Sequence, residues 1–341
     1  MDEKKDIWCG IDVSKNDMAV ALDIDRDKPV RRLPHATFKR TIDGLREMLD
    51  WCAEQGAGGD KLHVLMESTG VYSRDLLQWF QNHFPEIHVS MGNPKHVKHF
   101  IDSEHLGNKT DNLDAMAIAR MGTVQKPRRT PLPPPEYLQL QELIRARDDL
   151  KTKMRALEVS RSTMRDDGSV ASASVLQVIR VMADGVKKIE EAIYDLVARI
   201  PEIKAVVKRM STMPGIGTIS ACTILSELGM FSPEFTRTSF SGFTGLQPVL
   251  RQSGTSVNSS RIGKNGSPLL RKVIYLCSIH AVEKIPSLKS FHARLIARGK
   301  KPLTARCACM RKMLLILRSM VLNKTDFKEN YLTSPKMDKV V

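Results

Sequence analysis

The 341-residue chain has few aromatic residues and no long apolar run. Aromatic residues make up only 5% of the sequence, although 42% of it is apolar, which is enough for real hydrophobic cores. No apolar run reaches the length of about 20 residues that a membrane span needs. The start, rich in Asp, Glu and Lys, does not resemble a signal peptide. We therefore expect a cytoplasmic protein of two or three domains with no membrane partner.

The sequence also lacks the paired cysteines of a zinc site. No two cysteines form a CxxC pair, and the scattered thiols are more typical of reduced core or surface residues than of metal ligands. The six cysteines are Cys9, Cys52, Cys222, Cys277, Cys307 and Cys309.

Acidic residues are nearly absent from one long segment. Between Arg251 and Thr325 there are 16 Lys or Arg residues and one acid, Glu283. This excess equals the formal net charge of the whole chain, +15, so positive and negative charges are equal in number over the rest of the chain. A balanced chain with one basic block predicts a surface that binds a polyanion. In this segment we expect nucleic-acid contacts from Arg251, Arg261, Lys264, Arg271, Lys272, Lys300, Lys301 and Arg306.

Two smaller basic clusters lie upstream, at residues 95–99 and 126–129. The second lies in a proline-rich stretch and is explained by solvation alone. The first lies between acidic blocks, where Lys95 and Lys98 could grip a phosphate backbone. Lys109 is a further candidate of the same kind.

Four acids stand at informative positions. Asp12 ends the apolar run 7–11, and Glu67 ends the apolar run 62–66. Asp111 and Asp114 are three apart at the start of an apolar-periodic segment, so they share one helix face. Two strand ends and one helical turn can converge, and the four carboxylates would then repel one another unless a hard cation lay among them. Oxygen-only ligands suit Mg²⁺ or Mn²⁺ in a site that cuts phosphodiesters.

Each acid taken alone is also explained as a solvated residue at the end of an element. Asp111 could simply begin a helix that Thr110 caps. The serines Ser253, Ser256, Ser259 and Ser260 are equally open as nucleophile candidates on the residues alone.

The motifs resemble a known family. GIDVSK, MESTGVY and NKTDNLDA resemble the three blocks of the DEDD transposases, the Piv-like enzymes of insertion-sequence family 110. MPGIGTISA, GFTGLQP, RQSG and RIGKNGSPLLRK resemble the C-terminal region of that family, in the same order. The resemblance implies a DNA transposase or recombinase whose catalytic residues are Asp12, Glu67, Asp111, Asp114 and the serine of RQSG, Ser253.

The resemblance implies more than the residues show. Strand exchange would pass through a phosphoserine, and a structured guide (bridge) RNA would pair with donor and target DNA. The enzyme would be a bacterial, nucleoid-associated homo-oligomer, a dimer of dimers whose active sites join the acids of one subunit to the serine of another. The alternatives are a metal-only RuvC-like junction nuclease, in which Ser253 is incidental, and a non-catalytic nucleic-acid scaffold.

The element pattern predicts an α/β N-terminal domain. Its order of strands and helices, with an acid after the first strand, is similar to the RuvC-like branch of the RNase H fold. Sugar kinases of the actin type share this beginning, but no glycine-rich phosphate loops follow here. We expect strands over 6–13, 17–24, 29–37, 61–66 and 86–91, and helices over 41–54, 71–83 and 111–122.

The remainder is predicted to be mostly helical. Prolines break the chain near 127–136, and apolar residues at alternating steps of four and three from Val175 to Ile200 form a coiled-coil seam. We favour contact between chains along this seam over a hairpin folded on itself. Met213-Pro214-Gly215-Ile216-Gly217 could offer backbone amides to a phosphate, or could be a packing turn. The predicted parts are a catalytic domain 1–126, a linker 127–136, a coiled-coil oligomerisation hairpin 137–204, a transposase domain 205–326 with a looped region over 240–267, and a polar tail 327–341.

Overall fold

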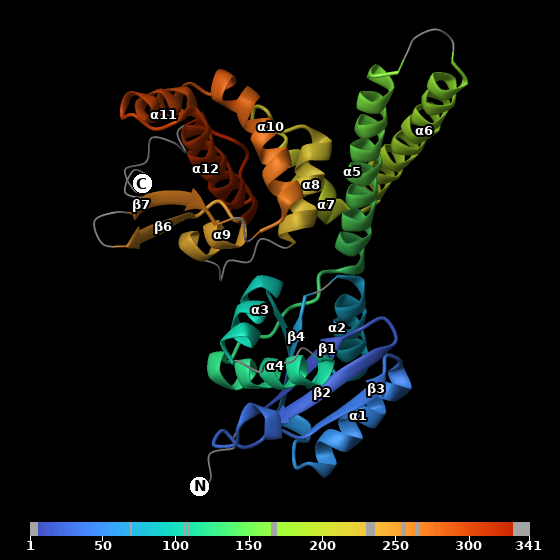
Figure 1. Cartoon of the computed structure of the whole chain (residues 1–341). Coiled ribbons are helices and arrows are strands. Elements are labelled where there is room, and N and C mark those ends of the chain that lie inside the picture. The colour runs from blue at the N-terminus through green and yellow to red at the C-terminus, as the bar shows by residue number, and fades with distance from the viewer. Residues whose placement is uncertain are drawn as a thin grey trace. The chain divides into compact units, whose positions relative to one another are not determined.

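The protein divides into two compact units, Met1–Leu132 and Pro133–Val341. In the computed structural model (Figure 1), residues 6–68, 70–104, 107, 110–164, 169–229, 236–253, 257–263 and 266–329 are described. Of residues 60, 250–253 and 257–260, only the backbone is described. None of the helices in these ranges is both long and apolar enough to cross a membrane.

The N-terminal unit is built on a five-stranded mixed sheet, which confirms the predicted α/β class. The strand order is β3-β2-β1-β4-β5. The β1, β2 and β3 strands pair antiparallel, whereas β4 and β5 extend the sheet in parallel with β1. The strands are β1 (Ile7–Val13), β2 (Asp17–Asp23), β3 (His35–Lys39), β4 (Leu62–Glu67) and β5 (His88–Gly92).

Helices cover both faces of this sheet. The α1 (Ile42–Glu54) and α2 (Val71–His83) helices pack on one face, in a core that takes alternate strand residues such as Cys9, Ile11 and Met66. The α3 (Pro94–Ser103) and α4 (Asp111–Gln125) helices cover the opposite face, against the intervening residues. Since successive strand residues point to opposite faces, Asp12 and Glu67 belong to the face covered by α3 and α4.

Two local predictions for this unit need correction. The expected strand over 29–37 is instead a short 3-10 helix (η1, Val30–Arg32) followed by β3, because Pro29 and Pro34 interrupt an extended ladder. The α3 helix was not predicted, although Asn93 caps it, with the side chain accepting a hydrogen bond from the Lys95 amide, and Pro94 occupies its first turn. A second 3-10 helix, η2, spans Gly59–Lys61.

The first part of the predicted linker is bound to the sheet. The Thr130 amide donates to the Val89 carbonyl at 2.8 Å, and the Met91 amide donates to Thr130 Oγ1 at 2.9 Å. Ser90 Oγ donates to the carbonyl of Arg128 at 2.9 Å. Residues 127–130 therefore cover β5, which would otherwise expose an edge of the sheet.

The C-terminal unit is mostly helical, as predicted, and its helices share a large apolar core. The described helices are α5 (Pro135–Ser162), α6 (Val170–Arg199), α7 (Pro201–Met210), α8 (Thr218–Leu228), α9 (Arg237–Phe243), α10 (Pro268–Lys284), α11 (Pro286–Ala297) and α12 (Pro302–Leu322).

The α5 and α6 helices form a long hairpin within one chain (Figure 1). From the predicted seam on α6, Val186, Ile193 and Leu196 are buried, and Ile193 and Leu196 join the core of the unit. Arg147 on α5 donates to Glu190 on α6 at 2.6 Å. The hairpin that we treated as the alternative is thus present, while contact between chains stays a prediction.

The region 240–267 contains more regular structure than the glycine pattern indicated. After α9, the strands β6 (Pro248–Ser253) and β7 (Val257–Ile262) pair antiparallel as a separate two-stranded sheet. We call this pair the serine hairpin, because Ser253 is the last residue of its first strand.

Candidate functional site

Asp12 and Glu67 lie side by side at the carboxyl ends of the neighbouring strands β1 and β4. The parallel strands β1 and β4 pair in a register that aligns Ile11 with Met66, so the next residue on each strand is one of these acids. Both side chains belong to the same face and are half-buried. The register therefore places the two acids on neighbouring strands, while their joint binding of a metal stays a prediction.

The α4 helix lies directly on β1 and runs in the opposite direction. A Cβ atom on Gly10 would lie 2.2 Å from the Ala115 carbonyl oxygen, and a Cβ atom on Gly122 would lie 2.5 Å from the Trp8 ring. Trp8 thus lies beside Gly122 and Gly10 beside Ala115, so α4 runs antiparallel to β1. Two residues further on, Asp12 meets the first turn of α4.

The first turn of α4 carries the remaining two acids. Thr110 Oγ1 accepts a hydrogen bond from the Leu113 amide at 3.3 Å and caps the helix. Asp111 and Asp114 occupy the first turn, where the helix dipole favours negative charge. We call Asp12, Glu67, Asp111 and Asp114 the acid edge.

A pocket of about 360 Å³ lies at the acid edge and includes both Asp12 and Asp111. Most of the other polar residues of this pocket were not predicted from the sequence. Thr37 Oγ1 donates to Asn112 Oδ1 at 3.4 Å, and Asp17 forms an ion pair with Lys39 at 2.8 Å. The short turn between the first two strands, which returns Asp17 beside Asp12, was the signal that could have identified Asp17. The pocket is lined by Asp12, Ser14, Asp17, Ala19, Thr37, Thr110, Asp111 and Asn112.

The acid edge fits a hard divalent cation in its donor chemistry, since all its donors are carboxylate oxygens. Across the described residues, no three His, Cys, Asp or Glu side chains lie close enough together to hold a metal ion. The placement of the acids on one edge therefore suits a metal, and binding by all four requires their side chains to move closer together.

The α3 helix begins two residues after Gly92, the strand end that pairs with Glu67, and it carries two of the predicted lysines. Val97 anchors α3 in the core beneath α4, while Lys95 and Lys98 are exposed. The first turn of α3, which carries Lys95, therefore follows closely on the strand end that pairs with Glu67, and phosphate contacts of Lys95 and Lys98 stay a prediction. Lys109 lies outside the described residues.

The serine hairpin carries the other predicted catalytic residue. Ser253 pairs with Val257 at the end of the two-stranded ladder, and Arg251 pairs with Ser259. The backbone of Ser260 also lies in β7. Ser256 and Lys264 lie outside the described residues.

The glycines of residues 213–217 have different environments. Gly215 has φ +91° and leaves no room for a side chain, because a Cβ there would lie 2.8 Å from the Cys277 carbonyl oxygen on α10. This supports the packing interpretation of the turn. Gly217 instead faces open space before α8, and phosphate binding there stays a prediction.

The predicted cations of the C-terminal unit divide into paired and exposed ones. Lys272 forms an ion pair with Asp148 on α5, Arg271 donates to the Gly266 carbonyl, and Arg306 donates to the Ser278 carbonyl at 3.3 Å. These three have structural partners inside the chain. Arg261, Lys300 and Lys301 are exposed and available to a polyanion.

Two arginines of α12 that the sequence did not single out lie beside α9. Arg311 Nε donates to Ser241 Oγ at 3.0 Å, and the Arg318 guanidinium lies 5.5 Å from the centre of the Phe240 ring. Burial lowers the pKa of both guanidinium groups, and the charge of Arg237 lowers the pKa of Arg318 further. Their spacing of seven residues on one helix face was the available signal. They place positive charge next to the helix that precedes the serine hairpin.

Known proteins resemble this chain over nearly its whole length. The pilin gene-inverting protein of Moraxella bovis is 26% identical over 332 residues, which cover 94% of this chain and 97% of that protein. The same-named protein of Moraxella lacunata matches to the same extent. The transposase for insertion sequence element IS1111A of Coxiella burnetii is 25% identical over 228 residues, 57% of this chain and 61% of that protein.

Two family models match separate parts of the chain. One, described as transposase, represents the DEDD part of the IS110 type and matches residues 9–162, which contain the acid edge. The other, described as transposase of the IS116/IS110/IS902 family, matches residues 207–293, which contain the serine hairpin. The family that the sequence motifs predicted is therefore confirmed: the chain belongs to the IS110 family, and it is a DNA transposase or recombinase.

Proposed function

We propose that this enzyme is an RNA-guided transposase that cuts and exchanges donor and target DNA strands through a phosphoserine at Ser253. In this proposal Asp12, Glu67, Asp111 and Asp114 hold Mg²⁺ or Mn²⁺. The main support for this proposal is that α4 runs antiparallel to β1, so that Asp111 in its first turn lines the same pocket as Asp12.

The residues of the acid edge have separate tasks. When bound, the divalent cation would stabilise the charge that develops on the scissile phosphate. Asp12 and Glu67 would offer carboxylates from neighbouring strands, and Asp111 and Asp114 would complete the set from a capped helix end. Lys95 and Lys98, exposed on α3, attract the DNA backbone toward this edge.

The proposed covalent step keeps the energy of the phosphodiester. Ser253 Oγ loses its proton and bonds to the phosphorus, while the bond from phosphorus to one deoxyribose oxygen breaks and that oxygen takes up a proton. A hydroxyl of the partner strand later attacks the phosphoserine and releases Ser253. One phosphoester replaces another at each step, so no external energy source is required.

Ser253→Ala tests this proposal against the metal-only nuclease. The variant should lose both recombination and covalent DNA capture on a denaturing gel, while the matched change Ser259→Ala on the other strand should retain both. Mass spectrometry of the adduct peptide identifies the serine. An adduct at another serine would move the site, whereas efficient cleavage by Ser253→Ala with no adduct in the parent enzyme would favour a metal-only nuclease.

The proposed RNA guide is supported by charge and composition. Residues 133–341 carry 34 Lys or Arg against 18 Asp or Glu, while aromatic residues are scarce. Such a surface suits backbone recognition, which leaves sequence reading to base pairing. RNA that copurifies with the enzyme should contain segments matching the flanks of its own element. Purification of a fully active enzyme without RNA would contradict this part of the proposal.

The similarity to proteins named for inverting a pilin gene supports exchange of two DNA sites rather than simple cutting. We propose a dimer of dimers that holds these sites together. Val178 and Val181, 45% and 66% exposed on α6, are available for contact between hairpins. Aspartate at both positions should lower the mass measured by light scattering, with helicity unchanged. An unchanged mass would place the subunit contact elsewhere.

We further propose that the N-terminal unit is RuvC-like, which its strand order and the acid near the end of β1 support. The proposed boundaries are those expected above, 1–126, 127–136, 137–204, 205–326 and 327–341. Limited proteolysis should cut first within 131–134, between the residues bound to β5 and the start of α5, and protection throughout 131–136 would contradict the linker.

A further inference from the structure

The α4 helix lacks an apolar pattern that would define its position on the sheet. Residues 115–119 are all buried, as are Met121, Gly122 and Thr123, so the helix is apolar around most of its circumference. A helix that is apolar on nearly all sides is typical of the interior of a protein. Toward β1, α4 presents Ala115, Ala119 and Gly122, which permit close approach, while Met116, Ile118 and Met121 pack among the surrounding core side chains. A directional polar contact would add to this packing in fixing how far α4 lies along β1.

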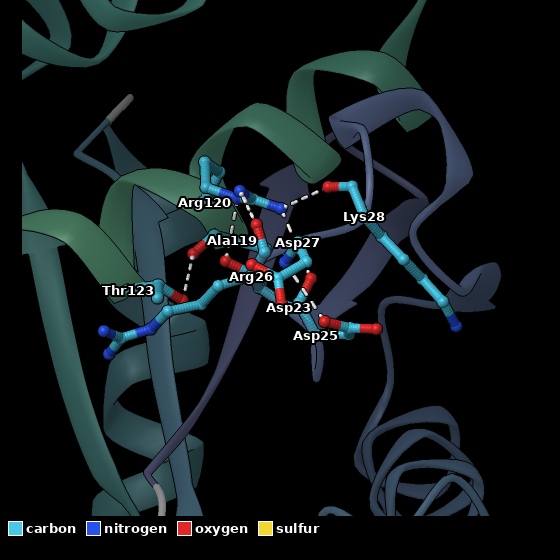
Figure 2. Close-up of polar contacts among 8 residues, drawn as sticks. All are labelled: Asp23, Asp25, Arg26, Asp27, Lys28, Ala119, Arg120 and Thr123. Carbon is cyan, nitrogen blue, oxygen red and sulfur yellow. Dashed lines mark hydrogen bonds and ion pairs between the residues drawn. The ribbon is translucent and has the colours of Figure 1, made fainter.

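Arg120 supplies such an interaction (Figure 2). Its Nε lies 3.0 Å from Oδ2 of Asp23, a carboxylate with no solvent exposure at the end of β2. Nη1 donates to the Arg26 carbonyl at 2.8 Å, and Nη2 donates to the Lys28 carbonyl at 2.7 Å and the Asp25 carbonyl at 3.5 Å. All three guanidinium nitrogens thus join α4 to β2 and the turn that follows it. We call this group of contacts the clamp.

The Asp23 carboxylate depends on this arginine. The contact with Nε is an ion pair without hydrogen-bond alignment, and neither Asp23 oxygen accepts a hydrogen bond from a described residue. A buried ion pair of this kind often specifies one arrangement of the chain rather than adding net stability. A planar, three-pronged contact restricts both rotation and sliding of α4.

The clamp lies at the end of the sheet opposite the acid edge. Asp23 pairs with Trp8, whereas Asp12 pairs with Ala19. Along α4, Arg120 is nine residues from Asp111, about 13 Å at the rise of an α-helix. Because a helix transmits displacement along its axis, a clamp at Arg120 determines where the first turn stands relative to Asp12.

We infer that the Arg120–Asp23 clamp is a positioning device that sets α4 in register with β1 and thereby aligns Asp111 and Asp114 with Asp12 and Glu67. This inference rests on the proposed function for the metal, since it assigns the clamp a role in metal binding. Its structural part, the register of α4, stands on the contacts alone.

The test replaces the clamp by apolar residues of similar shape, Asp23→Leu with Arg120→Met. This double change leaves no buried charge unpaired, so the chain should fold. The matched control is Asp43→Leu with Arg46→Met, an exposed ion pair on α1 of the same unit. Arg120→Lys is the conservative variant: it keeps a cation beside Asp23 but loses the three-pronged contact. It carries the test alone if the double variant does not fold.

Two measurements on the full chain separate the outcomes. Amides of residues 115–119 should exchange hydrogen about tenfold faster in the clamp variant. The affinity for Mn²⁺, measured by electron paramagnetic resonance, should fall by about tenfold, as when other outer partners of a metal site are lost. Arg120→Lys should be intermediate and the α1 control unchanged.

The inference would be overturned if the clamp variants exchanged amide hydrogen at the rate of the parent enzyme and bound Mn²⁺ with the parent's affinity. A different result would overturn only the metal site of the proposed function. In that case the clamp variants would exchange hydrogen faster, but neither they nor Asp12→Asn would bind Mn²⁺ more weakly than the parent enzyme. The positioning of α4 by the clamp would then still stand.

Discussion

The acid edge and the serine hairpin are assembled in opposite ways. The acid edge joins residues about 100 positions apart, because α4 returns to lie on β1. The serine hairpin pairs Ser253 with Val257, only four residues further on. One site depends on tight packing between distant segments, and the other depends on a local ladder of backbone hydrogen bonds.

This difference determines which mutations should damage each site. Changes outside the acid edge, at Gly10, Gly122 or Arg120, should displace its carboxylates. The serine hairpin should tolerate distant changes and respond mainly to changes in its own strands. The predictions below test this contrast, from the largest expected effect to the smallest.

Asp12→Asn should have the largest effect. Removing one charge from the acid edge while keeping the side-chain volume should slow DNA strand cleavage by roughly a thousandfold, about 4 kcal/mol. Single-turnover cleavage of labelled DNA measures this rate. Asp17→Asn is the matched control, because Asp17 lines the same pocket but is paired with Lys39. Equal losses in both variants would mean that the pocket needs negative charge without a specific carboxylate.

Gly10→Ala should destabilise the N-terminal unit by about 3 kcal/mol, since the added methyl group would meet backbone atoms of α4 that cannot turn aside. Denaturant unfolding followed by tryptophan fluorescence reports this unit alone, because Trp8, Trp51 and Trp79 all lie in it.

The matched change near the serine hairpin is Gly242→Ala on α9. There the added methyl group meets only the end of the Gln247 side chain, and alanine favours the helix, so stability measured by circular dichroism should hold or rise slightly. A loss as large as that of Gly10→Ala would remove the contrast between the two regions.

Reversing the charge of Lys300 and Lys301 to Glu should weaken nucleic-acid binding without altering which sequence is preferred. Each lost phosphate contact should reduce the slope of log K against log salt by roughly 0.9 on duplex DNA. Arg46→Glu on α1 is the control in the balanced N-terminal unit. A changed sequence preference would show that these lysines contact bases.

His63→Gln should have the smallest effect, on the pH dependence of stability. Burial lowers the pKa of His63, and the charge of neighbouring His88 lowers it further. The unfolded chain therefore binds a proton more readily, so the parent loses stability as the pH falls from the ordinary histidine value toward the lowered one.

The His63→Gln variant should lose less stability than the parent over that pH range, by a few degrees at most in thermal unfolding followed by tryptophan fluorescence. His83→Gln at the exposed end of α2 should behave like the parent. A steeper loss in His63→Gln would show that the Asp6 contact, which raises the pKa, dominates.

The acid edge was largely predictable from the sequence. Asp12 and Glu67 follow largely apolar runs, and the carboxyl ends of buried parallel strands lie together. Asp111 and Asp114 were recognisable because helix starts have strong local signals, here Thr110. The direction of α4 along β1 was not predictable, since it depends on the absence of a Cβ atom at Gly10 and Gly122.

Other features depended on tertiary contacts that no local pattern contains. The apolar seam on α6 has the same spacing whether its partner is α5 or a second chain. Asp23 and Arg120 were two ordinary charges in the sequence, and only the fold shows that they are buried together. The η1 helix replaced part of a strand because Pro29 and Pro34 outweighed the strand preference of the residues between them.

The return of α4 onto β1 also has a consequence for biosynthesis. Contacts between residues so distant in sequence form slowly, because a long loop must close before they gain any free energy. Ribosomes deliver the N-terminal unit first, and its last helix ends at Gln125. The carboxylates of the acid edge can therefore fold into place while the segment that contains Ser253 is still being translated. A nascent chain released at that stage would have its acid edge but would lack the proposed nucleophile.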